Sequence, residues 1–179
     1  ASDVYKRQEL ICRKGKCLAE LKHLVEPIKI FQDILHEDKT HAYTLMAYAY
    51  HSLINIKNNK LAEKLFLKLN KHHPTYHPKS LYFGLARVYQ NYGELIISDF
   101  YYREAIKYNY NDQISIYLFY ARLLSHSNDY DNAKVQYQKC FALCKKQKND
   151  HMMHHVHREY HNLCQIYSPV SYTHLTLPT

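Results

Sequence analysis

The sequence repeats one short pattern three times at a nearly constant spacing. In each copy a small residue is followed four positions later by an aromatic ring: Ala62 and Phe66, Ser98 and Tyr102, and Ala133 and Tyr137. A small residue lets two helices approach closely, and the ring fills the next layer of side chains between them. A period of about 35 residues with this signature predicts stacked helical hairpins. We therefore expect an all-α, right-handed α-solenoid of antiparallel hairpins with eight or nine helices.

The repeat divides the chain into consecutive units. We expect a degenerate unit at 9–42, full units at 43–78, 79–113 and 114–149, and a final helix at 150–167 that either caps the array or opens a further unit. In the degenerate unit, Pro27 stands in the place of Ala62, which predicts a shortened second helix. Its first helix is expected to place Ile11, Leu18, Leu21 and Val25 on one apolar face.

The middle unit carries a family resemblance. It reads Tyr82-x2-Leu85-Ala86-x2-Tyr89, followed by Gly93, Ser98-x3-Tyr102 and Ala105. This pattern resembles the tetratricopeptide repeat (TPR), although the chain has no Trp and its period is slightly longer than 34 residues. The resemblance implies a non-catalytic scaffold whose first helices line a concave groove for a peptide or a partner protein.

The resemblance also indicates which side chains face that groove. Two polar positions are equivalent in three successive units: one holds His51, Arg87 and Arg122, and the other, four residues later, holds Asn55, Asn91 and His126. An aromatic residue lies near each pair, namely Tyr48, Phe83 and Phe119. Such a surface is basic and carries amides, so it suits an extended acidic peptide. The family's Lys/Asn clamp for peptide carboxy-termini is not reproduced, because Gly84 stands where one Asn would be.

The charge balance favours acidic partners without choosing among them. Lys and Arg number 24 against 16 Asp and Glu, a formal net charge of +8. Peptides, nucleic acid and anionic surfaces all remain possible. One alternative is a pentatricopeptide-like RNA-binding array, because residues 43–66 would also pass as such a unit. Another is a regulatory TPR arm of a longer enzyme or transcription factor.

A histidine-rich segment, HMMHHVHREYH at 151–161, is the most metal-like part of the chain. His154, His157 and His161 share one side of a helix, but Cys140 and Cys144 fall on the apolar stripe of the helix before it. Thiols in a core and imidazoles facing water do not converge, so we expect neither a metal site nor a cofactor. No catalytic motif occurs either, and the prediction is that the protein is not an enzyme.

The five cysteines form no disulfide framework, and their odd number without a CxxC pair is typical of reduced thiols. This favours a cytoplasmic location. The longest apolar run is too short for a transmembrane helix, so no membrane span is expected in this fragment.

Both chain ends differ from the repeats in character. The strings DVYKRQ at 3–8 and SYTHLTLPT at 171–179 resemble translated sequencing-adapter sequence. We interpret residues 1–8 and 168–179 as non-native ends, and we expect the true termini to lie outside this sequence.

Overall fold

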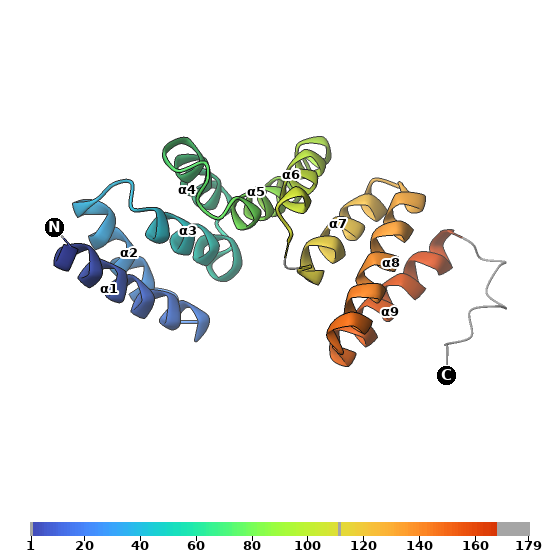
Figure 1. Cartoon of the computed structure of the whole chain (residues 1–179). Helices are drawn as coiled ribbons and strands as arrows, with labels where there is room; N and C mark the ends of the chain where they lie inside the picture. The colour runs from blue at the N-terminus through green and yellow to red at the C-terminus, as the bar shows by residue number, and fades with distance from the viewer. Residues whose placement is uncertain (1, 111, 168–179) are drawn as a thin grey trace. The chain divides into compact units, whose positions relative to one another are not determined.

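The computed structural model describes residues 2–110 and 112–167 (Figure 1). Within these residues all regular structure is helical, which confirms the predicted all-α hairpin fold. The α-helices are α1 (Ser2–Glu20), α2 (Glu26–Glu37), α3 (Ala42–His51), α4 (Asn59–His72), α5 (Pro78–Tyr92), α6 (Leu95–Lys107), α7 (Ile114–His126), α8 (Tyr130–Gln147) and α9 (Asp150–Tyr167). A π-helical turn, η1 (Ser52–Ile56), extends α3. None of the described helices combines the length and the hydropathy that a bilayer crossing requires.

The helices form two compact units, and each is described by itself. Unit 1 ends at Tyr108 and unit 2 begins at Asn109. In unit 1, α1 pairs with α2, α3 with α4, and α5 with α6. In unit 2, α7 pairs with α8, and α9 packs on α8.

The repeated small-plus-ring pattern lies in the core, as the spacing predicted. Ala62, Ser98 and Ala133 are completely buried, and so are the rings of Phe66 and Tyr102. The Ser98 hydroxyl donates to the Ala86 carbonyl over 2.8 Å, so this small polar residue joins α6 to α5 without an unpaired group. Burial of each ring contributes about 1.5–3 kcal/mol through the hydrophobic effect.

Local sequence signals set the helix ends. Asn58 caps α4 by accepting the Leu61 amide over 3.0 Å, and α5 ends at Gly93, whose φ of 79° favours glycine. Pro27 lies in the first turn of α2, where its missing N–H costs nothing. Helix α2 has 12 residues, against 14 in α4 and 13 in α6, so the shortened second helix stays a prediction.

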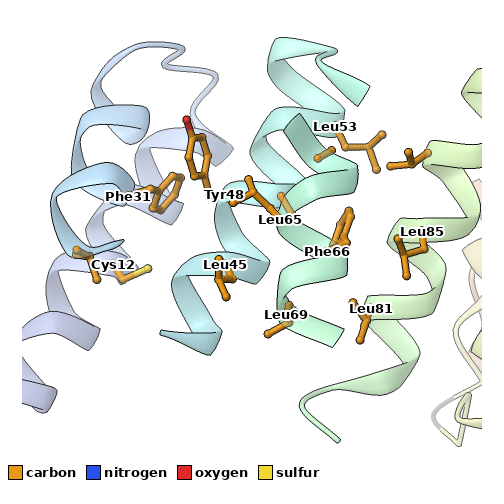
Figure 2. Close-up of a cluster of buried hydrophobic side chains, with 14 residues drawn as sticks. Cys12, Phe31, Leu45, Tyr48, Leu53, Leu65, Phe66, Leu69, Leu81 and Leu85 are labelled. Carbon is orange, nitrogen blue, oxygen red and sulfur yellow. The ribbon is translucent and has the colours of Figure 1, made fainter. Parts of the chain in front are cut away.

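The core of unit 1 runs from α1 to α5. Figure 2 shows Phe66 and Leu69 of α4 facing Leu81 and Leu85 of α5. Gly84 lies against the Phe66 ring so closely that a Cβ atom at this position would overlap the ring. The close contact of α4 with α5 therefore depends on this missing side chain.

Helix α1 turns the opposite way from the sequence prediction. Its buried residues are the small ones, Cys12, Gly15 and Ala19, whereas Ile11, Leu21 and Val25 are exposed. A Cβ on Gly15 would meet side-chain atoms of Ile30 and Phe31 at 3.0 Å, so α2 approaches too closely for a large residue. The predicted apolar face was wrong, because close helix packing selected the small side chains.

The segments interpreted as non-native ends are only partly described. Helix α1 begins at Ser2, and Gln8 Nε2 donates to Glu37 Oε2 over 2.8 Å. The tail at 168–179 lies outside the described residues. The interpretation of both ends stays a prediction.

Candidate functional site

A groove of about 600 Å³ lies along the first helices of the three hairpins of unit 1. It is lined by α1 and the turn after it, by α3 with η1, and by the start of α5 with the loop before it. Its residues, named here the unit 1 groove, are Lys16, Ala19, Glu20, Lys22, Tyr43, Met46, Ala47, Tyr50, His51, Ile54, Asn55, Tyr76, His77 and Ser80. The family resemblance predicted a groove on these helices.

The centre of the groove is apolar. Tyr43, Met46, Ala47, Tyr50 and Ile54 recur at steps of three and four residues, so α3 and η1 present them on one side. Ile54 is 50% exposed, whereas the other four are half-buried. This surface can receive an apolar side chain from a ligand.

Tyr50 is held rigidly in this surface. Its Oη donates to the Ser80 carbonyl over 2.6 Å, and its ring meets Phe66 edge to face at 5.2 Å between centroids. Burial raises the pKa of Tyr50, while the nearby Arg87 charge opposes the shift. The phenol is therefore a neutral donor that fixes α3 to α5.

One end of the groove is closed by hydrogen bonds from η1. Asn55 Nδ2 donates to the Ala19 carbonyl over 2.9 Å and to His51 Nδ1 over 2.8 Å. His51 Nε2 lies 3.1 Å from the Leu24 carbonyl, which only accepts, so the proton is on Nε2. The π-helical turn places Asn55 against the end of α1, while His51, the last residue of α3, contacts the turn that follows α1. Lys57 ends η1 in the left-handed region at φ 59°.

The rim of the groove is charged. Lys16 and Glu20 form an exposed pair at 3.7 Å, and Lys22 lies just beyond them. His77 lies at the opposite side and meets Tyr76 edge to face at 4.6 Å. Cations therefore exceed carboxylates around an apolar centre.

The structure brings only some of the predicted groove residues to this site. His51 and Asn55 line it, but His51 is almost completely buried, and its Nε2 is bonded to the Leu24 carbonyl in the turn that follows α1. Tyr48 and Phe83 are core residues at 5% and 7% exposure, so neither presents an open pocket. Their aromatic character reflects helix packing.

The remaining predicted residues of unit 1 are not among the residues that line the groove. Asn91 donates to Asn59 Oδ1 over 3.0 Å on the exposed surface. The Arg87 guanidinium lies over the Phe83 ring at 5.9 Å. Neither residue lines the cavity.

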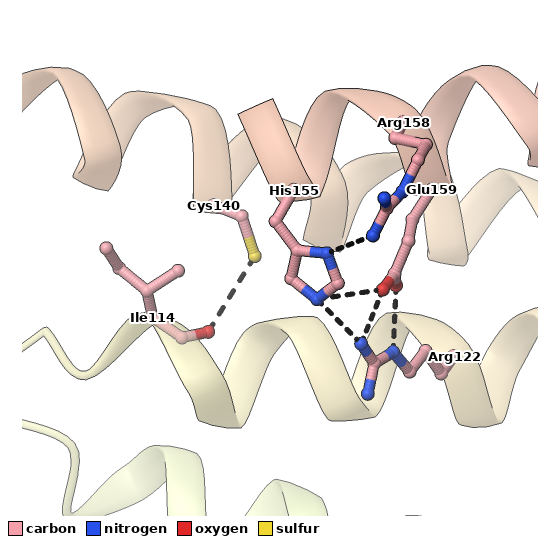
Figure 3. A network of polar contacts seen from close by, with 6 residues as sticks. All are labelled: Ile114, Arg122, Cys140, His155, Arg158 and Glu159. Atoms are coloured by element: carbon pink, nitrogen blue, oxygen red, sulfur yellow. Dashed lines mark hydrogen bonds and ion pairs between the residues drawn. The ribbon is translucent and has the colours of Figure 1, made fainter. Parts of the chain in front are cut away.

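Phe119, Arg122 and His126 belong to unit 2. Figure 3 shows Arg122 forming a two-pronged ion pair with Glu159 of α9, with Nε 2.8 Å from Oε2. The same guanidinium lies 3.1 Å from His155 Nε2 and 4.7 Å above the Phe119 ring. The arginine expected to bind a ligand carboxylate thus binds a carboxylate of its own chain, while His126 is exposed.

The histidine and cysteine placements follow the sequence analysis. His154, His157 and His161 are exposed, whereas Cys140 and Cys144 are completely buried. Within 2–110 and 112–167, no group of three or more His, Cys, Asp or Glu residues is arranged to hold a metal ion.

Sequence reasoning missed the apolar centre of the groove. The signal was present, because Tyr43, Met46, Tyr50 and Ile54 form a second stripe on the helix that carries Tyr48 and His51. Choosing the ligand-facing stripe required knowing which side of α3 packs on α2 and α4.

Comparison with solved structures identifies the architecture. A thermophilic TPR protein of Thermus thermophilus superposes with a TM-score of 0.68 at 15% identity, covering 92% of this chain and 93% of that one. The fold is that of a TPR protein. Crystallised MamA matches with a TM-score of 0.67 at 13% identity over 99% of this chain and all of that one. PilF of Pseudomonas aeruginosa matches at 0.67 and 15% identity over 92% of this TPR-like chain and 78% of its own.

Sequence comparison adds nothing to this fold assignment. No protein-family model matches the chain, and no curated protein matches it in sequence.

Proposed function

We propose that the protein is a non-catalytic scaffold and that its unit 1 groove binds a peptide segment of a partner protein. The supporting observation is the position of the groove on the first helices of three hairpins, with an apolar centre and a basic rim. An extended peptide would place an apolar side chain over Met46, Ala47 and Ile54. It would direct an adjacent carboxylate toward Lys16 or Lys22.

The chemistry of the groove favours this ligand over a purely ionic one. Exposed ion pairs contribute little, whereas an apolar anchor removed from water contributes about 1.5–3 kcal/mol. Lysines on the rim then select for acidic neighbours of the anchor and raise the association rate. A peptide with Leu flanked by Glu combines both features.

Binding of a labelled 12-residue peptide with one central Leu flanked by Glu tests the proposal by fluorescence anisotropy. Ile54→Asp should weaken binding at least tenfold, because it places a charge in the apolar centre and repels the peptide. Leu67→Asp on α4 is the matched control, since Leu67 is 40% exposed and lies outside the groove. Equal losses in both variants would refute the groove as the site.

The RNA-binding alternative is separated in the same assay. A single-stranded oligouridine that binds more tightly than the peptide, with affinity falling steeply as salt rises, would replace the peptide proposal. The expected result is that peptide affinity depends on Ile54 at every salt concentration.

A further inference from the structure

Three hydrogen-bond donors converge on one carboxylate in unit 2. Arg122 Nε donates to Glu159 Oε2 over 2.8 Å, and Arg122 Nη2 donates to Glu159 Oε1 (Figure 3). His155 Nε2 lies 3.1 Å from the same Oε1. Arg122 belongs to α7, whereas His155 and Glu159 belong to α9. The carboxylate therefore offers two oxygens to three donors from two helices.

Arg158 determines which histidine nitrogen faces the carboxylate. Its Nη2 lies 3.1 Å from His155 Nδ1. Because a guanidinium group only donates, Nδ1 is the bare nitrogen and the proton is on Nε2, directed at Glu159 Oε1. Arg122 Nη2 lies 3.1 Å from the same Nε2, since both nitrogens share that oxygen. Two donors thus crowd a single acceptor atom.

The Arg122 guanidinium is held in place on its other side by an aromatic ring. It lies 4.7 Å from the centroid of the Phe119 ring, which is a favourable cation–π distance. The side chains of Arg122, Glu159 and His155 are 30%, 18% and 33% exposed, so all three reach solvent. Donors that are already fixed in position lose little freedom when they bind a ligand.

Positive charge exceeds negative charge in this group of side chains. Its members, named here the Arg122 cluster, are Arg122, His155, Arg158 and Glu159, so two guanidinium charges face one carboxylate. On α8, burial raises the pKa of both Tyr137 and Cys140 to about 12, and neither adds a negative charge. The cluster therefore attracts an external anion.

A phosphate monoester suits these donors better than a carboxylate does. An external carboxylate would offer the same two oxygens as Glu159, which is tethered beside Arg122 at a high effective concentration. A phosphate monoester carries a charge of about −1.5 to −2 and three strong acceptor oxygens, so each donor gains an acceptor of its own. Its planar fork makes arginine well suited to phosphate. The added charge and oxygen allow a phosphate to displace Glu159.

We propose that Arg122 and His155 bind the phosphate group of a phosphorylated ligand in the place that Glu159 occupies. Arg158 keeps the imidazole proton directed at the phosphate, and the Glu159 side chain turns toward solvent when the ligand enters. The site lies within unit 2 and does not depend on the unit 1 groove. Ligand binding also releases an ion pair that joins α9 to α7.

A labelled, otherwise uncharged 12-residue peptide with one central phosphoserine tests the proposal by fluorescence anisotropy. The full chain should bind it at least tenfold more tightly than the same peptide with serine or glutamate at that position. Glu159→Gln should strengthen binding of the phosphopeptide at least tenfold, because the competing charge is removed. Arg122→Lys should weaken it at least tenfold, since the charge is kept but the fork is lost. Circular dichroism checks that both variants stay helical.

The role of His155 has a separate readout. Long-range proton–nitrogen NMR spectra of the free chain should show the Nε2–H tautomer of His155, and Arg158→Met should abolish that preference. An Nδ1–H tautomer in the free chain would contradict the assignment of His155 as a donor to the phosphate.

Two small phosphates identify the source of the ligand. Inorganic phosphate and glycerol phosphate should compete with the phosphopeptide only at concentrations at least tenfold higher than the peptide itself requires, which supports a phosphorylated protein segment. Competition at equal concentrations would assign the same site to a small phosphorylated molecule.

Two control variants test whether diffuse charge or the groove explains the binding. Lys146→Met removes an exposed cation of the same unit, which pairs with Asp112, and should leave phosphopeptide affinity unchanged. Ile54→Asp, in the unit 1 groove, should also leave it unchanged. Absence of phosphopeptide binding to the Glu159→Gln protein would overturn the proposal, and so would equal losses in Lys146→Met and Arg122→Lys.

Discussion

At the scale of single residues, burial controls the chemistry of the five thiols. Burial raises the pKa of Cys12 to about 11 and that of Cys140 to about 12, and it also raises the pKa of Cys144. Cys17, in contrast, is exposed on α1. Only a thiolate reacts readily with alkylating reagents. The buried thiols are therefore protected twice, because the reagent cannot reach them and because they stay protonated.

The first prediction concerns this difference. Iodoacetamide at pH 8 should modify Cys17 first, and mass spectrometry should find Cys12, Cys140 and Cys144 unmodified until the protein unfolds. Because the folded state keeps the buried thiols protonated, stability should also fall as pH rises from about 9, through the unfolded thiol pKa, toward 11 and 12. Alkylation of Cys140 at the rate of Cys17 in the folded protein would contradict this account.

At the scale of elements, the π-helical turn η1 joins the α1–α2 hairpin to α3. Asn55→Ala would leave the Ala19 carbonyl and His51 Nδ1 without their donor in a partly buried site. The expected loss of unfolding free energy is about 1–3 kcal/mol, measured by urea denaturation. Asn91→Ala is the control, because its hydrogen bond with Asn59 is exposed, and it should change stability by less than about 0.5 kcal/mol.

The second element-scale prediction concerns α9. Glu159→Gln removes the charge that pairs with Arg122, whose side chain is only 30% exposed against 18% for Glu159. Stability should fall by about 1–2 kcal/mol, reduced by partial solvent screening, and amide exchange in α9 should accelerate. Lys146→Met, which breaks the exposed pair with Asp112, should cause no measurable change. Equal effects of the two substitutions would show that the Arg122 pair does not hold α9.

Comparison of the elements shows what the sequence could predict. The repeat period predicted the helical-hairpin fold and placed Ala62, Ser98 and Ala133 in the core, because close helix contacts demand small residues at fixed intervals. It could not orient α1, where the small residues Cys12, Gly15 and Ala19 are buried and the larger Leu10 and Ile11 are exposed. Helix periodicity groups residues into faces, but only the approach of α2 at Gly15 decides which face is buried.

The candidate site was less predictable for a related reason. The resemblance assigned Arg122 to a ligand, because the acid that pairs with it lies 37 residues later on α9. Likewise, the partners of His51 and Asn55 are backbone carbonyls of Leu24 and Ala19, which no side-chain pattern reveals. Long-range polar contacts of this kind require the folded chain.

At the scale of the whole molecule, the two compact units predict two independently unfolding parts. Leu45→Ala in unit 1 and Leu123→Ala in unit 2 remove equally sized, buried side chains, each at a cost of about 2–5 kcal/mol. Hydrogen exchange followed by mass spectrometry should show faster exchange in α3–α5 for the first variant and in α7–α8 for the second. Faster exchange throughout the chain in either variant would indicate a single cooperative unit.

The contact of Gly84 with Phe66 limits how this scaffold can change by mutation. In the related clamp an Asn stands at the position of Gly84, but here any side chain at that position overlaps a completely buried ring. Gain of this Asn therefore requires two substitutions in a fixed order, with Phe66 reduced in size before Gly84 is replaced. The intermediate with a smaller residue at 66 carries a cavity, which costs about 3–5 kcal/mol for Phe→Ala. Single-site libraries and gradual evolution therefore cannot introduce Asn at position 84 without first weakening the core around Phe66.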